Sequence, residues 1–275
     1  MPKIIKINDL NTPEISVYTS LKASKSKRNA ELFIAESVKV INVALDKGIE
    51  PVSLLMEERQ IDGIGKELIA RMPDIPIYTA SREVLAELTG FELTRGLLCA
   101  MKRPKPALLD DVLKKAKRVA VLERLSDAEN VGAVFRSSAA LGFDAVLLFN
   151  NCSEPLNRRS VRVSMGSVFL VPWAFFEKED FPESSDAVRY LKSKGFTTAA
   201  LALKDNTIGI DNPILENTEK LALFLGAEGD GLSDDTINTC DYTVKIPMYN
   251  EVDSLNVATA AAISFWELRN KKSVE

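Results

Sequence analysis

The second half of the chain alternates short, almost wholly apolar runs with longer segments of mixed polarity. The apolar runs have the length of strands, and we expect strands at 118–122, 145–149, 168–171, 197–201, 221–225 and 242–246. The segments between them have helical character, and we expect helices at 131–141, 157–163, 185–194 and 255–269. Strands that alternate with helices predict an α/β fold with a mostly parallel sheet covered on both faces.

The first part of the chain shows the same alternation on a smaller scale. We expect strands at 32–35, 52–56, 75–78 and 96–101. We expect helices at 13–21, 37–47, 64–71 and 82–88. Segment 102–106 combines two prolines with three cations, which is typical of a linker. The sequence therefore predicts two domains, 1–105 and 106–275.

Composition excludes several classes of protein. The chain of 275 residues contains no histidine, which excludes a Ser-His-Asp triad, histidine-ligated zinc and histidine acid–base catalysis. Its three cysteines lie far apart, so we expect neither a disulfide framework nor a metal site, and we expect a reducing cytoplasm. No apolar run approaches the ~18 residues of a membrane span, and we expect no secretion signal.

The strand expected at 221–225 runs into a loop with three glycines and a carboxylate, Gly226, Glu228, Gly229 and Gly231. Glycine permits positive φ and a close approach of backbone to a ligand. The spacing differs from the dinucleotide-binding Gly-x-Gly-x-x-Gly, and no Gly-Lys-Ser/Thr follows as in a Walker loop. Taken alone, the loop is more often a structural turn than a binding site.

Two further segments combine polar residues with a helix start. Asn130 is a candidate N-cap for the helix at 131–141, and Arg136 follows among small and apolar residues. Taken alone, Arg136 is equally well explained as a surface arginine on a core helix. Ser254 and Asn256 precede the last helix, where an N-cap is the simplest role for either residue.

Together the three segments resemble the SpoU (TrmH-type) family of the SPOUT methyltransferase superfamily. The family motifs are Asn-x-Gly-x-x-x-Arg, Gly-x-Glu-x-x-Gly-Leu-Ser, and Ile-Pro-Met followed by Ser-Leu-Asn-Val, and all occur here in order. The resemblance covers about 118–270, and residues about 12–105 more weakly resemble the ribosomal-protein-like substrate-binding domain of many members. The family commonly has Asp-Pro where this chain has Asp127 and Ala128, which leaves the proposed catalytic positions intact.

The resemblance implies a parallel sheet with a deep trefoil knot, and 2′-O-methylation of RNA ribose with S-adenosylmethionine. It implies that Arg136 positions the target ribose and phosphate, because a guanidinium holds its proton too firmly to act as a base. It implies that four residues orient Arg136 and the loops: Asn130, Glu228, Ser254 and Asn256. It implies that the cofactor contacts Leu225, Gly226, Gly231, Ile246, Met248 and Leu255.

Local clusters of cations predict the RNA contacts, although the net charge of −4 argues mildly against nucleic acid. The candidate contacts are Lys25, Lys27, Arg28, Arg158, Arg159 and Arg162. Each cluster taken alone is more often a solvated surface, and their combination around an expected RNA site favours phosphate contacts. Ribosomal RNA is favoured over transfer RNA as the substrate. A non-catalytic RNA-binding protein that keeps the knotted fold is the alternative, which retention of the catalytic set disfavours.

The last helix predicts a homodimer. Apolar or small residues fall on nearly every side of it, with Phe265 and Trp266 as candidate anchors, so it needs a second partner besides its own sheet. The resemblance implies pairing through this region, with each active site completed by the partner chain. The alternative is that the N-terminal domain covers the second face.

Overall fold

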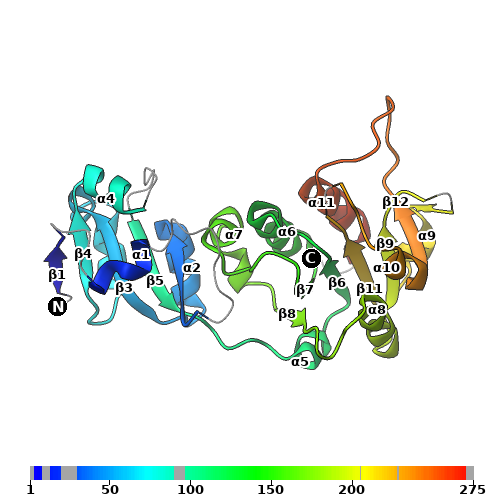
Figure 1. Ribbon diagram of the computed structural model, residues 1–275, viewed down its shortest axis with the longest axis horizontal. Coiled ribbons are helices and arrows are strands. Elements are labelled where there is room, and N and C mark those ends of the chain that lie inside the picture. The colour runs from blue at the N-terminus through cyan, green and yellow to red at the C-terminus, as the bar shows by residue number, and fades with distance from the viewer. Residues whose placement is uncertain are drawn as a thin grey trace. The chain divides into compact units, whose positions relative to one another are not determined.

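The computed structural model describes residues 3–7, 13–19, 30–89, 97–204, 206–227 and 229–270. The chain divides into two compact units (Figure 1). Unit 1 comprises Met1–Lys105 and Glu154–Phe169, and unit 2 comprises Pro106–Ser153 and Leu170–Glu275. No described helix has both the length and the apolar character needed to cross a membrane. Among these residues, no group of three or more Cys, Asp or Glu is placed to hold a metal ion.

Unit 1 contains a mixed five-stranded sheet in the order β1-β4-β3-β5-β2. Strands β1 and β3 run parallel to β4, whereas β5 runs antiparallel to both β3 and β2. The strands are β1 (Ile4–Lys6), β2 (Leu32–Glu36), β3 (Pro51–Glu57), β4 (Ile77–Ala80) and β5 (Leu97–Lys102). The helices are η1 (Pro13–Ile15), α1 (Ser16–Thr19), α2 (Val38–Asp46), η3 (Glu58–Gln60), α3 (Gly65–Ala70) and α4 (Arg82–Thr89).

Unit 1 is completed by a segment from far along the chain, which contains α7 (Arg158–Val163) and η4 (Ser167–Phe169). Arg158 Nη1 lies 2.5 Å from Glu36 Oε2, and Arg103 Nη1 lies 2.8 Å from Glu154 Oε1. All four side chains of these two ion pairs are largely buried. Burial lowers the pKa of Arg158, and the Glu36 carboxylate opposes that shift by stabilising the charged form.

Unit 2 is built on a seven-stranded sheet in the order β10-β12-β9-β11-β6-β7-β8, in which every paired strand is parallel. The strands are β6 (Arg118–Leu122), β7 (Ala145–Phe149), β8 (Trp173–Phe176), β9 (Thr197–Leu201), β10 (Ile208–Gly209), β11 (Leu221–Leu225) and β12 (Tyr242–Lys245). The helices are α5 (Leu109–Leu113), α6 (Ala128–Leu141), α8 (Ser184–Ser193), α9 (Pro213–Glu216), α10 (Asp234–Thr239) and α11 (Val257–Leu268). The expected parallel sheet of the C-terminal half is confirmed.

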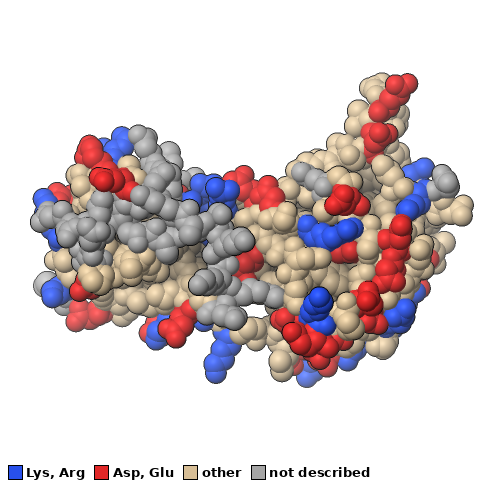
Figure 2. All heavy atoms as spheres, viewed as in Figure 1, with Lys and Arg blue, Asp and Glu red and all other residues tan. Residues whose placement is uncertain are grey.

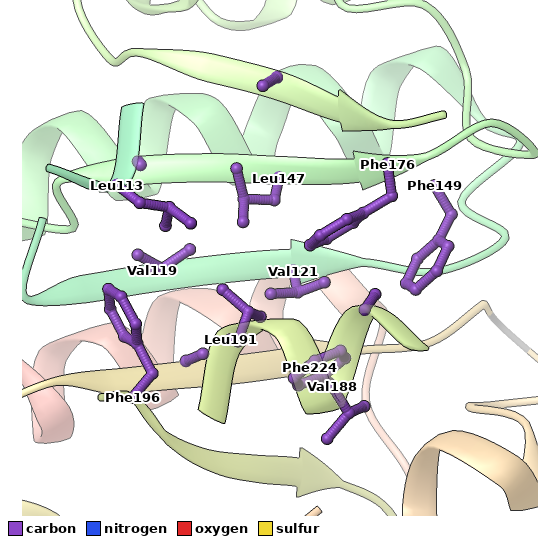
Figure 3. Close-up of a cluster of buried hydrophobic side chains, with 14 of the residues drawn as sticks. Leu113, Val119, Val121, Leu147, Phe149, Phe176, Val188, Leu191, Phe196 and Phe224 are labelled. Atoms are coloured by element: carbon purple, nitrogen blue, oxygen red, sulfur yellow. The ribbon is translucent and has the colours of Figure 1, made fainter. Parts of the chain in front are cut away.

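The central strands of unit 2 are apolar except for Arg118, because both faces of the sheet are covered. All five residues of β6, of β7 and of β11 are buried. Val119 and Val121 of β6 point into one cluster with Leu191 of α8 (Figure 3). Alternation along the strand directs Ala120 and Leu122 to the opposite face.

Helices α6 and α11 pack against each other in unit 2. Phe143, just after α6, stacks on Phe265 with ring centroids 3.9 Å apart. Phe265 is fully buried, so it belongs to the core of its own unit. Of the two expected anchors for a partner chain, only Trp266 is exposed.

Three details differ from the sequence-based predictions. The strand expected at 168–171 is wrong, since that stretch begins as the 3-10 helix η4 and β8 starts at Trp173, beyond Pro172. Proline lacks an amide donor, so it interrupts a strand more readily than it extends one. Asn130 is not the N-cap of α6: Asp127 is, and its Oδ1 accepts from Glu129 N at 2.8 Å. The helix therefore begins earlier than expected, with Asn130 in its first turn.

The buried ion pair between Arg158 and Glu36 predicts that Arg158 and its neighbour Arg159 contribute unequally to the stability of the fold. Arg158→Ala leaves the Glu36 carboxylate, with 5% of its side chain exposed, without its guanidinium. We expect this change to cost about 3–5 kcal/mol in the free energy of unfolding, measured by urea denaturation. Arg159→Ala is the matched control, because that neighbour is exposed, and it should change the free energy of unfolding by less than about 0.5 kcal/mol. Equal effects of the two changes would contradict this assignment.

Candidate functional site

The site lies where β6 and β11 end side by side. The two strands pair in parallel, with Leu122 opposite Leu225, so their carboxyl ends meet at one edge of the sheet. On one side of β6 the sheet continues with β7, the next strand in the chain. On the other side of β6 lie β11 and then β9. Ligands of open α/β sheets bind at such a point, where the strand order reverses direction.

The glycine loop after β11 folds back on itself. Ala227 and Gly231 form an isolated bridge, and Gly231 N donates to Ala227 O at 3.1 Å. A Cβ on Gly226 would lie 2.2 Å from the carbonyl carbon of Gly231 and 2.3 Å from Leu232 N. Gly229 and Gly231 have φ of +89° and +65°. The glycines are therefore required by the turn itself, in addition to any approach of a ligand.

Glu123, the residue after β6, fixes the far end of this loop. Its carboxylate accepts from Ser233 N at 3.2 Å and from Thr236 Oγ1 at 2.7 Å, and the residue is 3% exposed. Ser233 also caps α10, accepting from Thr236 N at 3.2 Å. Sequence reasoning missed Glu123, although a carboxylate that directly follows an apolar strand was a usable signal.

Asn256 joins the first and third motifs. Its Oδ1 accepts from Ala258 N at 2.9 Å, so it is the N-cap of α11. Its Nδ2 donates to Asn130 Oδ1 at 3.0 Å, across to the first turn of α6. The capping role and a role in the site are therefore compatible for Asn256.

A cavity of about 1130 Å³ opens above these strand ends. Its walls come from the loops after β6, β9 and β11 and from the segment between β12 and α11. The walls include every residue predicted to contact the cofactor, and two of the predicted catalytic set: Leu225, Gly226, Gly231, Ile246, Met248, Leu255, Ser254 and Asn256. The geometry thus brings the second and third motifs to one cavity.

Charged side chains line the rim of the cavity. Lys204 Nζ, after β9, lies 2.8 Å from Asp234 Oδ1 at the start of α10. The hydrogen bond from Lys204 lowers the pKa of Asp234. The segment between β12 and α11 projects from unit 2 (Figure 1) and carries Glu251 and Asp253, so acidic atoms gather on it (Figure 2).

Arg136 is not brought to this cavity within one chain. It is exposed on α6, about 9 Å along the axis from Asn130 and about 120° around it. Arg158, Arg159 and Arg162 belong to unit 1. The remaining predicted residues lie outside the described part of the chain: Glu228, Lys25, Lys27 and Arg28.

Comparison with known proteins identifies the family. The model of the SpoU rRNA methylase family matches residues 117–266, more than half of the chain. The chain therefore belongs to the SpoU rRNA methylase family, which confirms the resemblance noted in its motifs.

Relatives and solved structures agree with this assignment. An uncharacterised tRNA/rRNA methyltransferase of Mycobacterium tuberculosis is 38% identical over 97% of this chain and 88% of its own. The 23S rRNA (guanosine(2553)-2′-O)-methyltransferase of Bacillus subtilis is 28% identical over 80% of this chain and 87% of its own. An rRNA methyltransferase from Sinorhizobium meliloti, solved with AdoMet bound, has a TM-score of 0.81 at 23% identity, covering 99% of both chains. That last likeness shows a shared fold.

The cavity suits the cofactor that the motifs imply. Leu225, Ile246 and Leu255 supply apolar surface for an adenine ring, and the folded glycine loop presents backbone groups beside it. Pockets for ligands of this size commonly reach ~300–1,000 Å³ and combine apolar walls with a few polar groups.

The tight loop predicts the effect of a side chain at Gly226. Gly226→Val places carbon atoms against the backbone of Gly231 and Leu232, so the loop cannot close. We expect binding of S-adenosylmethionine to fall below detection by isothermal titration calorimetry. Gly63→Ala is the control, because that glycine has no left-handed φ and an added Cβ meets no atom closer than 3.5 Å. Undiminished affinity in Gly226→Val would place the cofactor elsewhere.

Proposed function

We propose that this protein transfers a methyl group from S-adenosylmethionine to a ribose 2′-hydroxyl of RNA. The observation that carries the proposal is the single cavity to which the second and third motifs both contribute, joined to the first motif by the hydrogen bond between Asn256 and Asn130. The cofactor supplies an electrophilic methyl group on a sulfonium. The apolar walls limit hydration around that charge, which favours a transition state in which the charge is dispersed.

Arg136 acts on the RNA rather than on the cofactor in this proposal. Its guanidinium offers several donors and a positive charge, which orient the ribose and a neighbouring phosphate and stabilise the developing alkoxide. Asn130 lies in the first turn of the helix that carries Arg136. Ser254 and Asn256 line the cavity, and Glu228 is proposed to act with them in ordering the loops.

We propose that two chains pair through α11 and thereby complete each site. Thr259, Ile263 and Trp266 recur on one face of α11, and the two apolar residues are 39% and 57% exposed. Arg136 lies exposed on α6, the helix that packs against α11, so pairing through these helices carries it towards the partner's cavity. This arrangement accounts for the separation of Arg136 from the cavity of its own chain.

We propose that the C-terminal end of the chain forms a trefoil knot. Strand β12 lies beyond β9 in the sheet, yet α11 packs against α6, which follows β6 on the other side of β11. Arg118 Nε, at the start of β6, donates to Leu268 O at 2.7 Å, and Asn256 holds the opposite end of α11. The last helix is thus anchored to β6 at its end and to α6 at its start, which supports a chain threaded past β11.

We propose that residues 1–105 bind RNA and that residues 106–275 carry the methyltransferase site. The candidates for phosphate contact are Lys25, Lys27, Arg28, Arg159 and Arg162, whereas the charge of Arg158 is matched by Glu36. Ribosomal RNA is the preferred substrate class, since the relative from Bacillus subtilis is named for 23S rRNA.

We propose that the protein works in the reducing cytoplasm. Cys99, Cys152 and Cys240 are free thiols. Burial raises the pKa of each of them to about 12, which keeps them protonated and unreactive at neutral pH. None of the three is therefore suited to catalysis.

Mixing two inactive variants tests whether the site is shared. Arg136→Ala should lower turnover more than ~100-fold while retaining cofactor binding. Gly226→Val should be inactive through loss of the cofactor. After the two variants are unfolded together and refolded, about one quarter of sites combine an intact cavity with the partner's Arg136, so activity returns to about that fraction of wild type. Absence of recovery in refolded dimers would mean that Arg136 serves its own chain.

Salt dependence tests the RNA contacts. Neutralising Lys25, Lys27 and Arg28 together to Gln should weaken RNA binding and lower the slope of log affinity against log salt by roughly 2–3. Binding of S-adenosylmethionine should not change. Replacing exposed Lys47, Lys66 and Lys117 by Gln gives an equal change of charge and should leave the slope nearly unaltered. An unchanged slope in the first variant would show that those cations are merely solvated.

A further inference from the structure

Arg124 is a cavity residue that none of the three motifs contains. It stands two residues after the end of β6, and its side chain lines the same cavity as the glycine loop. Its φ is +61°, in the left-handed region that a side chain disfavours. Arg124 N donates to Asn151 Oδ1 at 3.1 Å, which helps to hold this conformation. Strained positions of this kind cluster at functional sites.

One donor of the Arg124 guanidinium has no partner among the described residues of the cavity wall. Nη2 donates to Gly231 O at 2.9 Å. Nε is buried, and within the described part of the chain it has no hydrogen-bond acceptor. The nearest carboxylate oxygen to Nε, Glu123 Oε1, is 3.7 Å away and already accepts from Ser233 N. A buried guanidinium donor without an acceptor is costly. An anion held against the exposed part of the same guanidinium would offset that cost by stabilising its charge.

The other cations of the cavity are less suited to an anionic ligand. Lys204 is paired with Asp234 on the rim at 2.8 Å, and Lys245 is exposed. Arg124 has 35% of its side chain exposed, so its charge is less screened by water than that of Lys245. Arginine also offers two parallel donors, which match a carboxylate better than an ammonium does.

We propose that Arg124 binds the α-carboxylate of the cofactor's amino-acid end. This inference rests on the proposed function, which supplies a ligand with one carboxylate. The arrangement would fix the amino-acid end beside the end of β6 and would leave the adenine for the apolar walls around Leu225 and Ile246. The same guanidinium would then join the ligand to Gly231 O, so that binding tightens the glycine loop.

A pair of ligands that differ by one group isolates this contact. S-adenosylhomocysteine carries the carboxylate, and S-adenosyl-3-thiopropylamine is the same molecule without it. Calorimetric titration of both into the wild-type protein should show a preference for S-adenosylhomocysteine. In Arg124→Gln, the affinity for S-adenosylhomocysteine should fall about 10- to 100-fold, and that for S-adenosyl-3-thiopropylamine less than about 3-fold. The preference should therefore nearly disappear.

Two further variants guard against a purely structural effect. Arg124→Gly should lose the same preference while it relieves the left-handed strain, so the protein should fold normally. Lys117→Gln, at the opposite end of β6, should keep the wild-type preference. If Arg124 only braces the loop through Gly231 O, both ligands weaken equally, and that outcome overturns the inference.

The remaining outcomes also separate the hypotheses. A preference that survives in Arg124→Gln, or that is lost in Lys245→Gln instead, overturns the assignment to Arg124. A wild-type protein that binds neither ligand contradicts the proposed function itself. An outcome that overturns only the assignment to Arg124 leaves the proposed methyl transfer intact. A wild-type protein that binds neither ligand does not.

Discussion

The parallel pairing of β6 with β11 is the contact on which the site depends. It places the two strand ends side by side, so that Glu123 from one strand can hold the loop that follows the other. The loop can fold tightly only because Gly226 has no side chain. A buried carboxylate and a missing Cβ, far apart in sequence, thus shape the same wall of one cavity. The contacts that hold the two strand ends together therefore also shape the binding cavity.

Polar contacts fix the ends of the last helix, and apolar packing fixes its middle. Asn256 holds the first turn to α6, Arg118 holds the last carbonyl, and Phe265 stacks on Phe143 between them. Backbone groups at helix ends need partners: Asn256 Oδ1 accepts from Ala258 N at the start, and Arg118 of β6 donates to Leu268 O at the end. The side of the helix with Trp266 is left exposed in the single chain. The same helix thereby serves the core, the cavity and the proposed dimer.

Local sequence patterns predicted most strands of unit 2, because strands buried on both faces are almost wholly apolar. The residues expected to contact the cofactor came from the resemblance to the SpoU family and not from a local pattern, and they line the cavity at the strand ends. Local sequence patterns failed where a feature depends on the path of the chain or on residues far apart in the sequence. Asp127 and Asn130 are both good N-caps, and only the path of the chain selects Asp127. The pairing of Arg158 with Glu36 joins residues too distant in sequence for any pattern to connect.

The discontinuous make-up of unit 1 has a consequence for synthesis and for evolution. Residues up to Lys105 leave the ribosome well before Glu154–Phe169 does, a delay of several seconds at ~5–20 residues per second. During that time, Glu36 and Arg103 cannot form their ion pairs with Arg158 and Glu154. A recombination event that exchanged only the first 105 residues between relatives would separate these charges. Two distant stretches of the gene must therefore be inherited together.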